Sequence, residues 1–365
     1  MKPKLATAKE INKFIKIIDK NRYYSNYGPL YHLVAKQIKK KFNLKKKNIV
    51  LSSSCFSSLL ATLLLIKLKT KKRVVLVQSF GFFADIQSII LAGFQPYFID
   101  INPEKNHADD DSIKNFIKTK SKIKISDVAC CIIISPFGKP VKVEEINNIV
   151  KKYKIEVIYD AANTFLNLSE EIDNANFNIL CSFHPTKSLA ANESGCIVCN
   201  KKDKKDLESI LNFGIKQINL KRDIITLGFN GKFSEYDAAI FLANFKNFEK
   251  KKIIYTKFRQ TILKEKKINK KLKINFDNNF WISNILTVHF ENEKIKKYYF
   301  KRLRANRIHF YYPWGNKLLS DYSIFKEISK TNLKNSRHIV KNLIGIFLQP
   351  DYSIKKIKKI ISLLK

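Results

Sequence analysis

Residues 155–188 read IEVIYDAANTFLNLSEEIDNANFNILCSFHPTKS. The apolar runs Ile155–Tyr159 and Phe177–Phe183 have the length and composition of buried strands. Asp160 follows the first run at once, and a short turn that carries Lys187 follows the second. Ligands of open α/β sheets bind at the carboxyl ends of the strands. The stretch therefore predicts an α/β sheet with an aspartate and a lysine at its ligand-binding edge.

The same alternation of strand-like and helical segments continues on both sides of this stretch. Further strands are predicted at Val74–Val77, Pro96–Ile99, Val128–Ile134 and Gly195–Cys199. Segments with helical periodicity lie between them, at Cys55–Leu68, Phe83–Ala92, Ser112–Thr119 (with Asp111 as its N-cap) and Val143–Tyr153. This alternation predicts a mostly parallel sheet flanked by helices.

The pattern changes after an amphipathic helix predicted at Glu235–Phe248. Lys-rich helical stretches then flank a predicted strand, Ile285–Phe290, and the chain closes on a predicted helix, Ile354–Leu364. We therefore expect an N-terminal arm and large domain over residues 1–248, and a smaller C-terminal α+β domain over residues 249–365. A chain of 365 residues is long enough for two such domains.

The chain is strongly basic, with 69 Lys+Arg against 31 Asp+Glu and a formal net charge of +38. Such a charge is typical of nucleic-acid-binding proteins, and one built on an α/β scaffold is a remote alternative. Only eight of the basic residues are Arg, the side chain preferred for bidentate contacts with bases and phosphates. Because the Lys residues are spread along the whole chain, we interpret the charge as a solvated basic surface that also suits an anionic substrate. We expect no nucleic-acid partner.

The distribution of apolar residues and cysteines indicates where in the cell the protein is expected. No uncharged apolar run reaches the ~18 residues that span a bilayer, and the N-terminus lacks the apolar region of a secretion signal. We therefore expect a cytoplasmic protein without a membrane partner. Five of the six Cys fall in strand-like apolar surroundings, and Cys55 opens a helix. Cys196 and Cys199 would face opposite sides of a strand, so we expect reduced, buried thiols and no metal site.

Three polar sites follow predicted strands. The hydroxyl-rich turn Ser52–Ser58 enters a helix, where free N–H groups and the helix dipole can hold a phosphate; a plain Ser N-cap is the alternative. Asp160 can reach a ligand at the strand ends, or cap a helix. Lys187 in a short turn between apolar strands is unusual because burial of an ammonium is costly, although a surface lysine is the alternative.

Together these sites resemble the pyridoxal-phosphate (PLP) site of the DegT/DnrJ/StrS sugar aminotransferase family, which has the fold type I architecture. The match is carried by Ser-Phe-His-Pro-Thr-Lys at 182–187, which ends 27 residues after Asp160, and by the turn Ser52–Ser58. Further segments resemble the family in the same order, so that the resemblance covers most of the chain: Tyr24–Pro29, Phe80–Ala84, Phe137–Pro140 and Gly228–Glu235.

The resemblance implies roles at the coenzyme ring. Lys187 would bind PLP covalently through its ε-amino group and later move the proton between the amino donor and the coenzyme. Asp160 would pair with the pyridinium nitrogen. Phe82 would stack on the ring, and Asn163 would lie near its phenolic oxygen.

The resemblance also implies how the phosphate is held. Ser182 and the turn formed by Ser53, Ser54 and Cys55 would bind it within the subunit. Asn230 would reach it from the neighbouring subunit, which implies a homodimer with shared active sites.

The implied activity is a PLP-dependent aminotransferase that moves an amino group, with glutamate as the donor, to a nucleotide-linked keto-sugar. The product would be an amino-deoxy sugar for a surface polysaccharide or lipopolysaccharide. The phosphate turn has Ser54-Cys55 where the family has Gly followed by Thr or Ser, and Phe165 stands where a His is frequent. These departures leave a catalytically degenerate homologue open. The PLP-dependent sugar dehydratases of the family replace the lysine with His, so Lys187 favours the aminotransferase.

Overall fold

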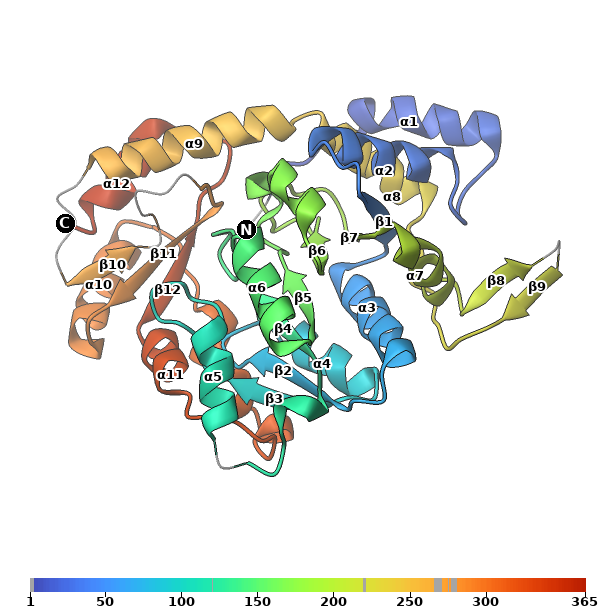
Figure 1. Cartoon of the computed structure of the whole chain (residues 1–365). Coiled ribbons are helices and arrows are strands. Elements are labelled where there is room, and N and C mark those ends of the chain that lie inside the picture. Colours follow the sequence, from blue (N-terminus) through green and yellow to red (C-terminus); the bar gives the residue numbers. More distant parts are fainter. Residues whose placement is uncertain (1–2, 120, 219–220, 266–270, 275, 277–280) are drawn as a thin grey trace.

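A seven-stranded sheet, with the order β1-β7-β6-β5-β4-β2-β3, forms the centre of the molecule (Figure 1). The computed structural model describes residues 3–119, 121–218, 221–265, 271–274, 276 and 281–365. The strands from β6 to β3 are parallel, and β7 is antiparallel to both of its neighbours. The prediction of a mostly parallel α/β sheet is confirmed. Its strands are β1 Lys47–Ser52, β2 Val74–Gln78, β3 Gln95–Ile99, β4 Val128–Ile134, β5 Glu156–Asp160, β6 Asn178–Ser182 and β7 Gly195–Asn200.

Both faces of the sheet are covered, because successive side chains of a strand point to opposite faces. In β4, Cys131 and Ile133 pack into the apolar cluster on one face, whereas Ile132 and Ile134 pack into the cluster on the other. The first face is covered by α5 Asp110–Lys118 and α6 Val143–Tyr153, and the second by α3 Cys55–Lys69, α4 Phe83–Leu91 and α7 Lys204–Ile210. These layers hold the strand ends in fixed positions.

Three helix predictions are wrong by two residues or more, and the one at Ile354–Leu364 ends at Ser362 instead. The N-cap of α5 is Asp109 rather than Asp111, because the Asp109 side chain accepts the N–H groups of Asp111 and Ser112 and the helix begins two residues earlier than predicted. The helix predicted at Glu235–Phe248 is two helices, α8 Glu235–Phe245 and α9 Phe248–Lys264. The Asn247 N–H bonds to the carbonyl oxygen three residues back, so the regular helical hydrogen-bond ladder is interrupted there.

The N-terminal arm consists of α1 Ala8–Asn21 and α2 Pro29–Lys41, which pack on α8. The Glu235 carboxylate accepts the backbone N–H groups of Leu30 and Tyr31, at 2.7 and 2.8 Å, and so caps α2 from a distant part of the chain. A β-carbon at Gly28 would lie 2.6 Å from the Glu235 Cδ atom. A side chain at this N-cap would therefore displace the Glu235 carboxylate from its position.

The C-terminal part forms a second, antiparallel sheet of β10 Leu272–Ile274, β11 Ile285–Phe290 and β12 Leu343–Phe347, with α10 Glu293–Ala305, α11 Lys334–Lys341 and α12 Ile354–Ser362. Helix α9 leads into it and packs on α12 (Figure 1). The chain then returns to the large sheet, where the N–H groups of Leu319 and Thr331 bond to the carbonyls of Ser79 and Phe98. Because the two parts share apolar clusters, the division at residue 248 stays a prediction.

A two-stranded hairpin, β8 Ile215–Ile218 and β9 Lys221–Ile224, projects from the body of the molecule (Figure 1, right). Apolar side chains are exposed at its end and just after it: Ile224, the last residue of β9, is 70% exposed and Leu227 is 82% exposed. The hairpin therefore presents apolar surface away from the core. Among the described residues, none of the helices has the length and apolarity to cross a bilayer.

Candidate active site

A cavity of about 410 Å³ lies where the carboxyl ends of β4, β5 and β6 meet the N-termini of α3 and α4. Most of the residues predicted from the sequence line it: Ser54, Cys55, Phe82, Asp160, Asn163, Ser182 and Lys187. Ser53 and Asn230 do not line it. The topology therefore brings together side chains from four separate stretches of the chain.

Lys187 projects from a tightly bonded turn after β6. Its N–H donates to the His184 carbonyl at 2.8 Å, and the Thr186 N–H donates to His184 Nδ1 at 3.1 Å. Because Nδ1 accepts this bond, the ring proton of a neutral His184 lies on Nε2, which is 3.0 Å from Glu193 Oε1. The Asn284 amide donates to the Thr186 carbonyl at 2.8 Å. His184 therefore orders the turn that presents the lysine.

Asp160 is the last residue of β5 and is 9% exposed. Its Oδ1 accepts the Ala162 N–H at 2.8 Å, so the side chain shapes the strand end and caps no helix. Burial raises the pKa of Asp160, whereas the Ala162 N–H and the charge of Lys187 act in the opposite direction. A carboxylate in such dry surroundings requires a cationic or hydrogen-bonding partner.

Asp85 is a site residue that the sequence analysis missed. It lies in the first turn of α4, lines the same cavity and is only 1% exposed. Neither of its carboxyl oxygens has a hydrogen-bond partner in the described part of the chain. Burial, followed by the Asp160 carboxylate, raises the pKa of Asp85 well above its usual range. An aspartate among the mainly apolar residues of Phe83–Leu91 was the available signal.

The turn before α3 offers backbone donors to the cavity. Ser54 is the N-cap of α3, and its Oγ accepts the Ser57 N–H at 3.0 Å. The N–H groups of Cys55 and Phe56 have no acceptor within the helix, and both residues line the cavity. Ser53 is engaged elsewhere, since its N–H donates to the Gly231 carbonyl at 2.9 Å and its Oγ lies 3.0 Å from Ser57 Oγ.

Gly195, the first residue of β7, packs against the turn before α3. A β-carbon on Gly195 would lie 2.7 Å from the Cys55 nitrogen, so this approach is possible only for glycine. Burial raises the pKa of the Cys55 thiol, which keeps it neutral. The N-terminus of α3 can therefore bind an anion without competition from a thiolate.

The remaining predicted residues line the walls. Phe82 is 45% exposed, and its ring lies against that of Phe83 with 3.9 Å between the centroids. The Asn163 amide donates to the Pro136 carbonyl at 2.6 Å. Ser182 Oγ accepts the His184 N–H at 3.3 Å. Each polar group is thus held by the framework around the cavity.

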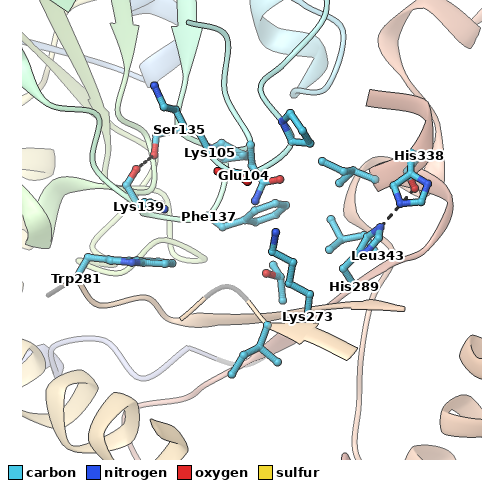
Figure 2. Close-up of a pocket in the computed structure, with 16 residues that line it drawn as sticks. Glu104, Lys105, Ser135, Phe137, Lys139, Lys273, Trp281, His289, His338 and Leu343 are labelled. Atoms are coloured by element: carbon cyan, nitrogen blue, oxygen red, sulfur yellow. Dashed lines mark hydrogen bonds between the residues drawn. The ribbon is translucent and has the colours of Figure 1, made fainter. Parts of the chain in front are cut away.

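A second pocket, of about 300 Å³, shares Ser135 and Pro136 with the first cavity and lies between the large sheet and β10–β11 (Figure 2). It contains Lys105, which is paired with Glu145 at 2.5 Å and Asp109 at 3.3 Å, and His289, whose Nε2 lies 3.5 Å from the His338 carbonyl. It contains none of the predicted site residues. We therefore place the candidate active site in the first cavity.

The residues of the first cavity fit PLP. Lys187 supplies a primary amine, Asp160 supplies a carboxylate suited to the ring nitrogen, and the N-terminus of α3 supplies donors suited to the phosphate. The α/β fold and this arrangement of amine, carboxylate and helix N-terminus define the fold type I class of PLP-dependent enzymes.

The chain belongs to the DegT/DnrJ/EryC1/StrS aminotransferase family, whose model matches residues 5–365. The dTDP-4-amino-4,6-dideoxy-D-glucose transaminase of Shigella dysenteriae is 27% identical over 252 residues, which span 68% of this chain and 64% of that enzyme. The UDP-4-amino-4,6-dideoxy-N-acetyl-beta-L-altrosamine transaminase of Campylobacter jejuni (strain 81-176) is 26% identical over 186 residues, 49% of this chain and 47% of that enzyme.

Solved structures confirm the fold over the whole chain. A candidate PLP-dependent aminotransferase from Bacillus cereus ATCC 10987 has a TM-score of 0.88 at 24% identity and covers 100% of this chain and 98% of that one. Helicobacter pylori PseC, an aminotransferase involved in the biosynthesis of pseudoaminic acid, has a TM-score of 0.82 at 15% identity, with 99% and 97% covered. The predicted family and the predicted fold type I architecture are therefore confirmed.

Proposed function

We propose that this protein is a PLP-dependent aminotransferase that acts on a nucleotide-linked keto-sugar. Asp160 ends β5, Lys187 lies in the turn after the neighbouring strand β6, and both line one cavity at the N-terminus of α3. This observation carries the proposal. Bound PLP would supply the electron-withdrawing ring that lets a proton leave the α-carbon of the amino donor.

The roles of the chain's own residues follow from their positions. The Lys187 amine would hold the coenzyme and then take up and return the proton at the reacting carbon. Asp160 would keep the ring nitrogen protonated. Ser54, Cys55 and Ser182 would bind the phosphate, mainly through the backbone N–H groups of the α3 terminus because a thiol is a weak donor. Phe82 would cover the ring.

The surroundings of the cavity support a large, anionic substrate. A third pocket, of about 440 Å³, adjoins the first cavity and shares Lys187 and Asn163 with it. Its walls are aromatic side chains that include Tyr311, Tyr312 and Trp314. The net charge of +38 suits a sugar carried on a diphosphate. The two relatives named above are transaminases of nucleotide-linked amino sugars. We propose glutamate as the amino donor, a surface polysaccharide or lipopolysaccharide as the destination of the sugar, and a cytoplasmic location.

We also propose a homodimer with shared active sites. Asn230 is exposed and lies outside the cavity of its own subunit. It follows the projecting β8–β9 hairpin, whose exposed apolar residues would be covered by a partner subunit. Asn230 would then reach the phosphate of the coenzyme in the partner.

The absorbance spectrum of the purified protein tests the activity. We expect a visible coenzyme band that disappears when glutamate is added and returns when a keto-sugar nucleotide is added. Borohydride reduction followed by peptide mapping should place the coenzyme on Lys187. A label on another lysine contradicts the site, whereas a band that does not respond to glutamate indicates a catalytically degenerate homologue.

A further inference from the structure

A second carboxyl group lies beside Asp160 in the wall of the cavity. Asp85 approaches from α4 and Asp160 from β5, and the Asp85 side chain is the more deeply buried of the two. The other titratable groups that face Asp85 are the Lys187 amine and the Cys55 thiol. The described part of the chain gives the Asp85 oxygens no donor.

Two ionised carboxylates are unstable in this position. A buried carboxylate without a hydrogen bond costs several kcal/mol, and adjacent carboxylates repel one another until one of them binds a proton. Asp160 is the better site for the negative charge, because it already accepts the Ala162 N–H and faces the cavity. A proton on Asp85 converts an acceptor without a partner into a donor that can bond to Asp160.

We propose that Asp85 is a neutral carboxylic acid at neutral pH and a positioning residue, whose O–H donates to the Asp160 carboxylate and holds it toward the ring nitrogen of the coenzyme. The two carboxyl groups then carry one negative charge, which matches the one positive charge of a protonated pyridine ring. The proposal rests on the proposed function, since it assigns a role within the same site.

The stability of the full-length protein as a function of pH tests the protonation state. The pKa of Asp85 is raised in the folded state by its burial and by the Asp160 carboxylate. The folded protein therefore binds the proton more tightly than the unfolded chain, and stability falls with rising pH from about 4, the ordinary pKa, up to the raised pKa. Asp85→Asn keeps the shape and a donor but cannot ionise.

Thermal unfolding between pH 5 and 9 should therefore show the melting temperature of the wild type falling relative to that of Asp85→Asn as the pH rises. Asp19→Asn on α1, where the side chain is exposed, is the matched control and should show a constant difference. A constant difference for Asp85→Asn as well would overturn the proposal. Carboxyl-¹³C NMR of the Asp-labelled wild type needs no variant, and the finding that every Asp is ionised at pH 7 would also overturn it.

The affinity for PLP tests the positioning role. Asp85→Leu removes the donor, and we expect it to raise the Kd for PLP about tenfold, as befits one hydrogen bond to a charged group, whereas Asp85→Asn should stay close to the wild type. Equal affinities for all three proteins would contradict the role. If the wild type itself bound no PLP, the proposed function would fail, and the unfolding titration would still report on Asp85.

Discussion

At the scale of single residues, the environment of a charged group decides what it can do. Asp160 and Asp85 have the same side chain, yet of the two only Asp160 accepts a backbone N–H group from the described part of the chain. Lys187 and Lys251 also have different environments. Lys187 faces the cavity. The Lys251 amine is buried and donates to the Ala190 carbonyl at 3.2 Å. These differences lead to two predictions.

Asp160→Asn should leave PLP bound and lower turnover by about 10²-fold or more. The amide keeps the shape and the acceptor for the Ala162 N–H, but it supplies no negative charge to the ring nitrogen. The coenzyme spectrum measures binding, and the rate of amino transfer from glutamate measures turnover. A variant that turns over at nearly the wild-type rate would show that Asp160 only shapes the end of β5.

Lys251 should make stability depend on pH in the alkaline range. Burial lowers the pKa of Lys251 to about 8. Between about pH 8 and the ordinary value near 10.5, the folded state has lost the proton that the unfolded chain keeps, so the wild type gains at most about 3 kcal/mol over that range. Denaturant unfolding of the wild type and Lys251→Met at several pH values should show this gain only in the wild type. The exposed neighbour provides the control, Lys250→Met, which should follow the wild type.

The sequence predicted the cavity residues that belong to local motifs and missed those defined by distant contacts. Asp160 ends the apolar strand β5 and Lys187 lies in the short turn after the apolar strand β6, and both positions are local signals. The importance of Asp85 depends on Asp160, which lies 75 residues further along the chain, so no local pattern could show that the two carboxyl groups meet.

At the scale of elements, the same distinction holds. Helix α6 and strand β11 have the bounds predicted from their periodicity. The sequence analysis did not predict α1 or α2, although the capping box of Thr7 and Glu10 at the start of α1 was a usable signal. The hairpin strand β9, Lys221–Ile224, is exposed along its whole length, so it lacks the apolar alternation by which strands are found.

The cap of α2 yields a prediction at this scale. Glu235→Ala should lower the free energy of unfolding by about 2–4 kcal/mol, because two buried N–H groups lose a charged acceptor. Denaturant unfolding measures the loss. Glu293→Ala, at the exposed first turn of α10, is the matched control and should change stability by no more than about 0.5 kcal/mol. Equal stability of the two variants would show that the Glu235 cap contributes little.

At the scale of the whole molecule, the shared active site can be tested by mixing inactive variants. Lys187→Ala removes the amine, and Asn230→Asp should place a carboxylate against the phosphate held by the partner subunit. If each site uses residues of both chains, a hybrid dimer has one site with both lesions and one site with neither. The mixture should therefore recover about a quarter of the wild-type activity at full statistical exchange, since half of the dimers are hybrids with one intact site.

The control mixture combines Lys187→Ala with Asp160→Asn. Both residues line the cavity of their own chain, so each site of a hybrid carries one lesion and no intact site forms. Asn230→Asp must first prove inactive alone. Failure of the Lys187→Ala and Asn230→Asp mixture to regain activity, with exchange demonstrated, would mean that Asn230 serves its own subunit.

The order of strands in the large sheet also bears on how the protein is made. Among the strands that the structure describes, β1 pairs with β7 alone, and residues 195–200 of β7 leave the ribosome long after residues 47–52. The N-terminus of helix α2 likewise lacks its carboxylate cap until Glu235 has been synthesised, 205 residues after Leu30. Strands β2 to β5 can pair with one another before β7 and Glu235 have been synthesised. The first segments to be translated are thus among the last to be fixed in place, and a nascent chain that stops short of residue 195 leaves β1 without a strand to join.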